Sequence, residues 1–339
     1  MSNHNFLKIG LIGVGHLGKI HLKCLLELPE IWQIVGFFDP SDANAAKIEA
    51  EFGIKRFAQV EELLASCDAV DIVSPTVSHF EMAEKAVRRK LHFFIEKPLT
   101  ETVEEGRQLL EMAARAGVIG QVGHVERFNP AFLAVKNLDL GPMFIESHRL
   151  SAFQPRGTDV SVILDLMIHD LDLILKMVKS PVTSVSASGV AVLSDTPDIA
   201  NARVEFENGC VANLTASRIS LKQMRKMRVF QPDAYISLDF LEKNAQIVRL
   251  FEPESPDLPV ADHFMELDTP RGKRLMLAEQ PETQPVNAIK MELQTFGESI
   301  WARSAPLVTL GDGLAALELA HRILEEINFR ATRFLGNTI

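Results

Sequence analysis

The sequence contains few cysteines. Cys24, Cys67 and Cys210 are the only three among 339 residues, and they are odd in number and far apart. This spacing offers neither a CxxC pair nor a framework of paired cysteines, so it excludes a small disulfide-stabilised secreted fold. We therefore expect free thiols in a reducing compartment, the cytoplasm.

Long apolar runs and an excess of positive charge are also lacking. No run approaches the roughly 18 apolar residues of a membrane span, and the opening MSNHNFLKIG lacks the layout of a signal peptide. Asp and Glu number 45 against 35 Lys and Arg, a net charge of -10. Because phosphate backbones require a basic surface, we expect neither a nucleic-acid nor a membrane partner. A small anionic substrate in a local basic pocket stays compatible with this charge.

The first third of the chain alternates apolar runs with helical patterns. Near-continuous apolar runs indicate strands buried on both faces, as in a parallel sheet. The alternation predicts a doubly wound α/β domain over residues 1–122. The expected strands are 7–14, 33–39, 69–75, 92–98 and 119–125, with 55–58 as a further candidate, and the expected helices are 18–28, 42–52, 79–89 and 103–116.

A glycine-rich turn, GVGHLG, follows the first expected strand and opens a helix. Gly13, Gly15 and Gly18 match the G-x-G-x-x-G pattern, whose glycines allow a tight turn and a close approach to a pyrophosphate. Asp39 ends the second strand, where a carboxylate bonds the ribose of NAD and repels the 2′-phosphate of NADP. The turn also places His16 and Leu17 at the cofactor. The sequence predicts an NAD site; a flavodoxin-like domain without a dinucleotide is the alternative.

Two further strand ends carry polar residues, and ligands of such sheets bind beyond the carboxyl ends of the strands. SPTVSH (74–79) places Pro75, Thr76 and His79 beside the expected nicotinamide, where turn chemistry is the plainer reading. FIEKPLT places Glu96 and Lys97 after an apolar strand. A lysine there is costly without a partner, so the residue itself indicates either an ion pair or a catalytic role. We also expect that the Lys97–Pro98 bond is a candidate for the cis form.

The stretch LDLMIHDLDL (164–173) contains acidic residues and a histidine within an apolar helical pattern. At about 100° per residue, Asp165, His169 and Asp172 fall on one stripe, and Asp170 projects away from it. The polar stripe is predicted to face a cleft. A satisfied polar network under a loop is the alternative. A metal site is not expected, because one imidazole and two carboxylates have no further clear ligands.

Together, GVGHLG, EKP and D-x-x-x-H resemble the glucose–fructose oxidoreductase, inositol dehydrogenase and rhizopine-catabolism (Gfo/Idh/MocA) family of NAD(P)-dependent sugar oxidoreductases, over essentially the whole chain. The resemblance implies a Rossmann domain followed by an α+β domain, here 123–339, whose large open and mainly antiparallel sheet often forms subunit interfaces. It also implies a homodimer or homotetramer. In that family the equivalents of Lys97, Asp165 and His169 line the nicotinamide site.

A narrower resemblance concerns the substrate. The stretches 122–132, 146–173 and 200–218 are most similar to UDP-N-acetylglucosamine 3-dehydrogenases, which oxidise a nucleotide sugar during lipid A biosynthesis. Many members that act on free polyols carry a glycine pair before the aspartate, whereas Gly157 stands alone here. The alternatives are a dehydrogenase of a free sugar or an inositol-like polyol, and a non-catalytic NAD-binding regulator.

A nucleotide sugar brings a diphosphate, which arginine forks match well. Arg127 and Arg156 are the arginines we favour as ligands, ahead of Arg149 and Arg218, although each arginine alone is more often an ion-pair residue. The expected substrate residues are Arg127, Asn129, Arg156 and Asp172, with Asn129 also a cap for a helix after Pro130.

The remainder of the second domain is strand-rich after residue 180 and predicts an antiparallel sheet. The stretch 252–285 is rich in proline and acidic residues and is expected to be a long irregular excursion. Two helical patterns follow, near 286–302 and 312–330.

Overall fold

The computed structural model describes residues 6–153, 160–256, 258–260 and 264–336. The chain divides into two compact units, the first formed by residues 1–128 and 287–318 and the second by residues 129–286 and 319–339. The sequence predicts one boundary near residue 122, so the structure differs in returning 287–318 to the first unit.

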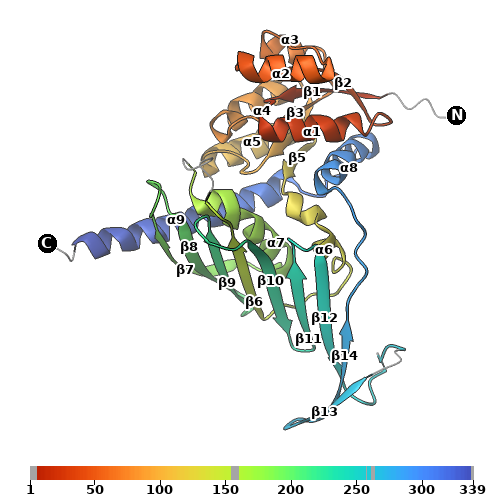
Figure 1. The fold of residues 1–339 in the computed structure, drawn as a ribbon, viewed down its shortest axis with the longest axis vertical. Helices are drawn as coiled ribbons and strands as arrows, with labels where there is room; N and C mark the ends of the chain where they lie inside the picture. Colours follow the sequence, from red (N-terminus) through yellow and green to blue (C-terminus); the bar gives the residue numbers. More distant parts are fainter. Residues whose placement is uncertain (1–5, 154–159, 257, 261–263, 337–339) are drawn as a thin grey trace. The chain divides into compact units, whose positions relative to one another are not determined.

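The first unit contains a five-stranded parallel sheet (Figure 1). Its strands are β1 (Leu7–Ile12), β2 (Trp32–Phe38), β3 (Ala69–Ile72), β4 (His92–Glu96) and β5 (Gly120–Gly123), in the order β2-β1-β3-β4-β5. β1 pairs with both β2 and β3, so the chain order reverses across β1. The predicted doubly wound sheet is confirmed.

The candidate strand at 55–58 is reduced to a single bridge. Phe37 pairs in parallel with Arg56, and two backbone hydrogen bonds join Phe37 to Lys55 and Phe57. With this bridge counted beside β2, the strand order is that of the dinucleotide-binding sheets, in which the crevice lies at the reversal.

Helices surround this sheet and bury apolar side chains on both of its faces. They are α1 (His16–Leu26), α2 (Asp42–Phe52), α3 (Val60–Leu64), α4 (His79–Arg88) and α5 (Val103–Ala116), with short turns η1 (Thr76–Ser78) and η2 (Val125–Phe128). Thr102 and Glu105 exchange hydrogen bonds as a capping box that begins α5.

α8 (Ala288–Ala302) completes the first unit. Leu293, Phe296 and Ile300 are buried in the same apolar cluster as α1 and β1. Phe296 stacks on Trp32, with ring centroids 5.6 Å apart. Apolar packing across a long sequence separation therefore assigns this helix to the first unit, which local patterns do not reveal.

The second unit is built on a nine-stranded sheet in the order β13-β14-β12-β11-β10-β6-β9-β8-β7 (Figure 1). Only β6 and β9 pair in parallel, and the predicted mainly antiparallel sheet is confirmed. The strands are β6 (Phe144–Leu150), β7 (Val182–Val190), β8 (Ile199–Phe206), β9 (Val211–Ser217), β10 (Met224–Gln231), β11 (Ala234–Asp239), β12 (Asn244–Phe251), β13 (Met265–Thr269) and β14 (Gly272–Glu279).

Helices cover one face of this sheet. Residues of α6 (Pro130–Leu133), η3 (Ile163–Met167), α7 (Ile168–Val178) and the second half of α9 (Leu310–Gly336) share one apolar cluster with the strands. Leu171 and Ile174 of α7 and Ile323 of α9 are fully buried in it.

The expectation of an irregular excursion over 252–285 is wrong in part. β13 and β14 form a hairpin there, joined by a turn at Gly272, whose φ is +102°, and β14 pairs with β12. Their sequences, MELDT and GKRLMLAE, are short or rich in charge and lie in a stretch rich in proline and acidic residues, so pairing with β12 defines them.

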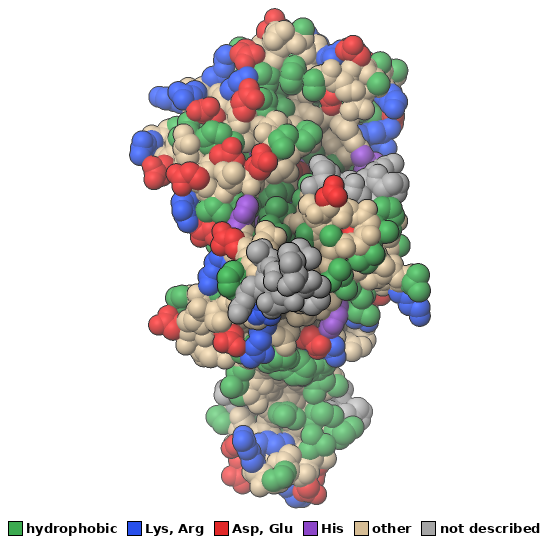
Figure 2. Space-filling model, turned by 90° about the vertical axis from the view of Figure 1, so that its left-hand side faces the viewer, with side chains coloured by type: hydrophobic (Ala, Val, Ile, Leu, Met, Phe, Trp, Pro, Cys, Tyr) green, Lys and Arg blue, Asp and Glu red, His purple; other side chains and the backbone are tan. Residues whose placement is uncertain are grey.

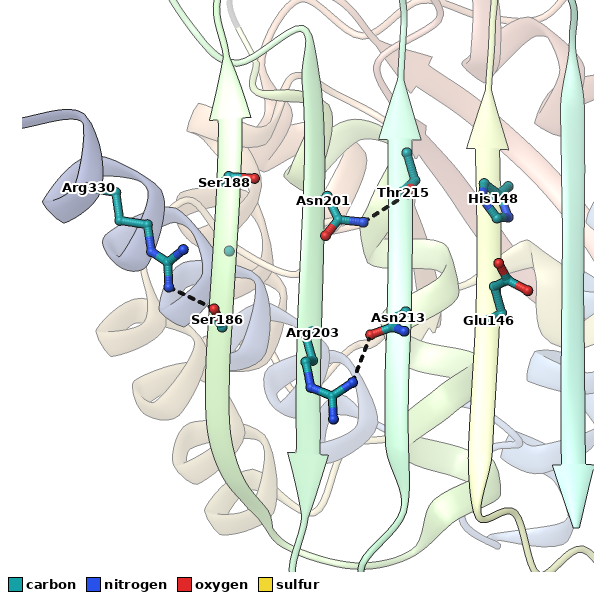
Figure 3. Close-up of a pocket in the computed structure, with 10 residues that line it drawn as sticks. Glu146, His148, Ser186, Ser188, Asn201, Arg203, Asn213, Thr215 and Arg330 are labelled. Atoms are coloured by element: carbon teal, nitrogen blue, oxygen red, sulfur yellow. Dashed lines mark hydrogen bonds between the residues drawn. The ribbon is translucent and has the colours of Figure 1, made fainter. Parts of the chain in front are cut away.

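Among the described residues, the other face of the nine-stranded sheet carries mostly polar side chains over β6 to β9 (Figure 3). They line a shallow hollow of about 500 Å³, where Asn201 donates to Thr215 at 3.0 Å. Arg330 of α9 donates to Ser186 at 2.7 Å at the end of this row. Further along the same face, Phe144, Phe230 and Tyr235 pack together, with ring centroids 5.8 and 5.0 Å apart.

On the face drawn in Figure 2, acidic and basic side chains are interspersed, in keeping with the net charge of -10. No helix in the described part of the chain combines the length and the apolar character that a membrane crossing needs.

Candidate functional site

A pocket of about 600 Å³ opens at the carboxyl ends of β1, β2 and β3, where the strand order reverses. Dinucleotides bind at this position of doubly wound sheets. The pocket brings together six residues that the sequence predicts for the cofactor, namely Gly13, Gly15, His16, Leu17, Asp39 and Pro75. The sequence reasoning missed Ser41 and Asn44, which also line it; their place just after the Asp39 strand end is the signal that could have found them.

The glycines of the turn are required by close contacts. A Cβ on Gly18 would lie 2.1 Å from the carbonyl oxygen of Gly13, and Gly13 itself has a φ of +92°. A Cβ on Gly15 would meet no protein atom within 4 Å. Gly13 and Gly18 are therefore fixed by the fold, whereas Gly15 leaves open space beside the start of α1, as a pyrophosphate requires.

Asp39 is buried at the end of β2 and is held by backbone donors. Its two carboxylate oxygens accept from the N–H groups of Val14 and Ser41, each at 2.8 Å. A carboxylate oxygen accepts more than one hydrogen bond, so Asp39 can still receive a ribose hydroxyl. The contacts tie the glycine-rich turn to the start of α2.

The structure also brings an arginine to this corner. Arg56 donates to the backbone oxygen of Asp39 at 2.9 Å and to the carboxylate of Asp42 at 2.8 Å. The sequence shows no arginine adjacent to Asp39, and only the bridge between β2 and 55–57 places Arg56 there. The corner therefore holds charges of both signs.

Glu96 ends β4 and Lys97 follows it, and the Lys97–Pro98 bond is cis, as proposed from the sequence. Glu96 is buried, whereas Lys97 is half-buried. His79 is buried beside this turn, with Nδ1 and Nε2 each 2.9 Å from a backbone oxygen, of Pro98 and Ser74. Burial lowers the pKa of His79, whose ring lies between the loops that carry Ser74 and Pro98. Thr76 and His79 are not among the residues that line the pocket.

Asp165 and His169 lie in the second unit, on different kinds of helix. Asp165 belongs to the π-helical turn η3, and His169 to the first turn of α7. The wider π turn changes the angular offset between the two residues, so the regular 100° spacing predicted from the sequence does not hold there. Both side chains are half-buried, and Asp172, further along α7, is buried.

Asp170 faces away from these residues and is structural. Arg149 on β6 donates to both of its oxygens, from Nε at 3.0 Å and from an amino group at 2.7 Å. Both side chains are almost fully buried, so this fork joins α7 to the sheet.

The other predicted substrate residues occupy several places. Arg127 is buried in η2 and pairs with Asp312 at 3.4 Å. Asn129 accepts from the N–H of Ala131 as the predicted cap of α6 and donates to the oxygen of Phe240 at 3.0 Å. Arg156 lies outside the described residues. Arg218 is buried, and it donates to the backbone oxygen of Val160.

Family comparison supports this reading of the pocket. Residues 7–124 match the family model described as an oxidoreductase family with an NAD-binding Rossmann fold (GFO_IDH_MocA), and residues 108–236 match that of its C-terminal domain.

Individual relatives cover most of the chain. A UDP-N-acetylglucosamine 3-dehydrogenase of Acidithiobacillus ferrooxidans is 39% identical over 299 residues, 88% of this chain and 93% of the relative. A solved structure of a UDP-N-acetylglucosamine 3-dehydrogenase from that organism superposes with a TM-score of 0.84 at 34% identity, covering 95% of this chain and 98% of the other. A scyllo-inositol 2-dehydrogenase (NAD(+)) of Bacillus subtilis is 30% identical over 63% of this chain and 68% of the relative.

Proposed function

Because the chain belongs to the Gfo/Idh/MocA family of NAD-binding oxidoreductases, we propose that it oxidises a hydroxyl of a nucleotide sugar to a ketone, with UDP-N-acetylglucosamine oxidised at carbon 3. The observation that carries the substrate is the 39% identity to a UDP-N-acetylglucosamine 3-dehydrogenase over 88% of the chain. The inositol dehydrogenase matches a smaller share of the chain at 30% identity, so a free polyol is the second candidate.

Separate residues have separate roles in this reaction. Bound NAD supplies the hydride acceptor, and the protein supplies position and charge. His169 takes the hydroxyl proton onto its imidazole as general base. Lys97 stabilises the substrate oxygen as negative charge develops on it. Asp165 orients the imidazole or the substrate. Lys97 directly follows β4 at the carboxyl-end edge of the parallel sheet, which supports its place at the cofactor.

We propose that Arg127 and Arg156 bind the diphosphate and that Asp172 contacts the sugar. The buried position of Arg127 supports its role, because a desolvated guanidinium recognises phosphate oxygens strongly. Asn129 acts chiefly by capping α6, since both ends of its amide are already bonded.

The substrate class is tested by comparing UDP-N-acetylglucosamine with free N-acetylglucosamine and myo-inositol under saturating NAD. We expect NADH formation only with the nucleotide sugar. Turnover of myo-inositol with a higher kcat/KM would instead establish the polyol activity.

NAD is preferred over NADP in this proposal, because Asp39 is buried at the ribose corner and repels a 2′-phosphate. Replacing Asp39 with Ser should lower kcat/KM for NAD about tenfold, the value of a hydrogen bond to a charged group. Activity with NADP should rise, because Arg56 then remains as the local charge.

Asp42→Ser is the matched control. It removes the carboxylate that Arg56 binds, on a side chain that is largely exposed, and leaves Asp39 in place. It should keep NAD preference. Equal use of NAD and NADP by the unaltered protein would contradict the role of Asp39.

The cysteines indicate where in the cell the reaction takes place. We place the reaction in the cytoplasm, where the free thiols of buried Cys24 and Cys210 stay reduced. There the ketone is a substrate for an amination step in lipid A biosynthesis.

We also propose that the chain forms a homodimer or homotetramer through the face of the nine-stranded sheet that carries Phe144, Phe230 and Tyr235. Clustered aromatic side chains on an open sheet face are typical of a subunit interface. Phe230→Lys should shift the sedimentation coefficient toward that of a monomer, whereas Leu221→Lys, at an exposed residue outside the sheet, should not. An unchanged oligomer in Phe230→Lys would place the interface elsewhere.

A further inference from the structure

Four titratable side chains meet in the interior of the first unit, and the function described above assigns a role to none of them. His21 of α1, Asp71 of β3 and Glu292 of α8 are fully buried, and Glu96 at the end of β4 is 8% exposed. Burial of charge is costly unless the charges are paired, so this cluster must have a defined protonation state.

His21 lies between two carboxylates. Its Nδ1 is 3.0 Å from an oxygen of Asp71, and its Nε2 is 3.1 Å from an oxygen of Glu96. The edge of Phe94 packs near the ring, with centroids 5.6 Å apart. The imidazole thus joins α1, which begins at the cofactor turn, to two strands of the sheet.

Glu96 also contacts Lys97, the residue that follows it in the chain. Its second oxygen accepts from the backbone N–H of Lys97 at 3.2 Å. Gly123 of β5 provides the space for the carboxylate, because a Cβ there would lie 2.7 Å from a Glu96 oxygen. The backbone that carries the Lys97 side chain is therefore held by a carboxylate that His21 contacts.

The charges indicate that the imidazole is protonated. Burial alone would lower the pKa of His21, but the charges of Asp71 and Glu96 and the hydrogen bond to Asp71 raise it well above its ordinary value. Burial acts against ionisation of Glu96, yet His21 and Lys97 lower its pKa. Burial raises the pKa of the Cys24 thiol, on the same helix, and the charge of His21 acts in the opposite direction.

Glu292 has the opposite character. Burial and the charge of Glu96 raise its pKa well above the usual value, so it is neutral when Glu96 is ionised. Neither of its oxygens has a hydrogen-bond partner among the described residues. One ligand atom each from His21, Glu96 and Glu292 lies within 4.8 Å of the others, so a bound cation is the competing explanation of the cluster.

We propose that His21 is a positioning residue for hydride transfer, which holds Glu96, and through it the backbone of Lys97, as a protonated bridge to Asp71. This inference rests on the proposed role of Lys97. It explains why a buried histidine faces carboxylates on both nitrogens, where a neutral imidazole has only one N–H to donate.

Two substitutions separate positioning from general support of the fold. In His21→Gln the amide nitrogen replaces Nε2 and keeps a donor toward Glu96, whereas in His21→Asn it replaces Nδ1 and keeps only the donor toward Asp71. His21→Asn should lower kcat on the order of a hundredfold, the effect of a misplaced catalytic group, with the Kd for NAD unchanged. The kcat of His21→Gln should be about tenfold higher than that of His21→Asn.

The controls make the outcomes distinct. His92→Asn, at the opposite end of β4, replaces a half-buried histidine whose Nδ1 accepts from the N–H of Ile119 and should keep full activity. If Lys97→Ala stays active, the proposed function fails. If Lys97→Ala is inactive while His21→Asn and His21→Gln match each other or the unaltered protein in kcat, the positioning role is wrong.

Protonation is measured without turnover. Nitrogen NMR of the imidazole should show both His21 nitrogens protonated at a pH about one unit above the ordinary histidine value, and Asp71→Asn should abolish this. A neutral ring at that pH, or a stoichiometric metal ion that is lost in His21→Asn, would overturn the proposal.

A pH titration of stability tests Glu292. A raised carboxyl pKa means that the folded state keeps its proton longer, so the free energy of unfolding falls as pH rises above the unfolded value, near 4.5. The amide of Glu292→Gln does not titrate. The free energy of unfolding of this variant, relative to that of the unaltered protein, should therefore rise as pH increases above the unfolded carboxyl value. Parallel curves would mean that Glu292 has an ordinary pKa, and a stability advantage that shrinks with pH would mean an ionised or cation-bound Glu292; either result would contradict this charge assignment.

Discussion

Replacing Lys97 with alanine should lower kcat for the nucleotide sugar on the order of a thousandfold, because the substrate oxygen loses the charge that stabilises it in the transition state. Lys97 lies at the end of β4, beyond which ligands of doubly wound sheets bind. The Kd for NAD, measured by fluorescence titration, should change little, since the glycine-rich turn and Asp39 are untouched. The effect should therefore appear in kcat.

The matched control is Lys47→Ala, which removes an exposed lysine from α2 of the same unit. It should keep full activity and the same thermal midpoint. Near-full turnover in Lys97→Ala, with correct folding shown by unchanged NAD binding, would end the catalytic assignment of this lysine.

Replacing His169 with alanine should also reduce kcat on the order of a thousandfold, the usual contribution of a general base. The half-buried side chain follows the π-helical turn at the start of α7, a feature that often marks functional sites. Added imidazole should restore part of the activity, because a free base can take the hydroxyl proton in the vacated space.

His321→Ala, at a half-buried histidine of α9 in the same unit, is the comparison. It should be fully active and insensitive to imidazole. If His169→Ala keeps its activity, the residue is not the general base. If imidazole has no effect while substrate binding is lost, the residue contributes binding in place of proton transfer.

The first unit could be predicted largely from the sequence, because its signals are local. Continuous apolar runs define the parallel strands, and the glycine pattern followed by Asp39 marks the cofactor turn. Five predicted strands and four predicted helices occur within a few residues of their expected bounds. The Asn129 cap is also confirmed.

What local patterns missed depends on distant contacts. α8 joins the first unit by apolar packing, β13 and β14 are defined by pairing to β12, and Arg56 reaches Asp39 through one bridge. The π turn at Asp165 departs from regular helical spacing, which a periodicity argument assumes. The His21 cluster escaped notice because its members come from four separate segments.

The most direct test of the central proposal uses UDP-N-acetylglucosamine carrying deuterium at carbon 3. With this protein and NAD, the label should appear in the reduced nicotinamide, and mass spectrometry should show a sugar nucleotide that has lost the label and one further hydrogen. Reduced cofactor that carries no deuterium would place the oxidation at another carbon. No cofactor reduction with any nucleotide sugar or polyol would contradict the assignment of this chain as a sugar dehydrogenase.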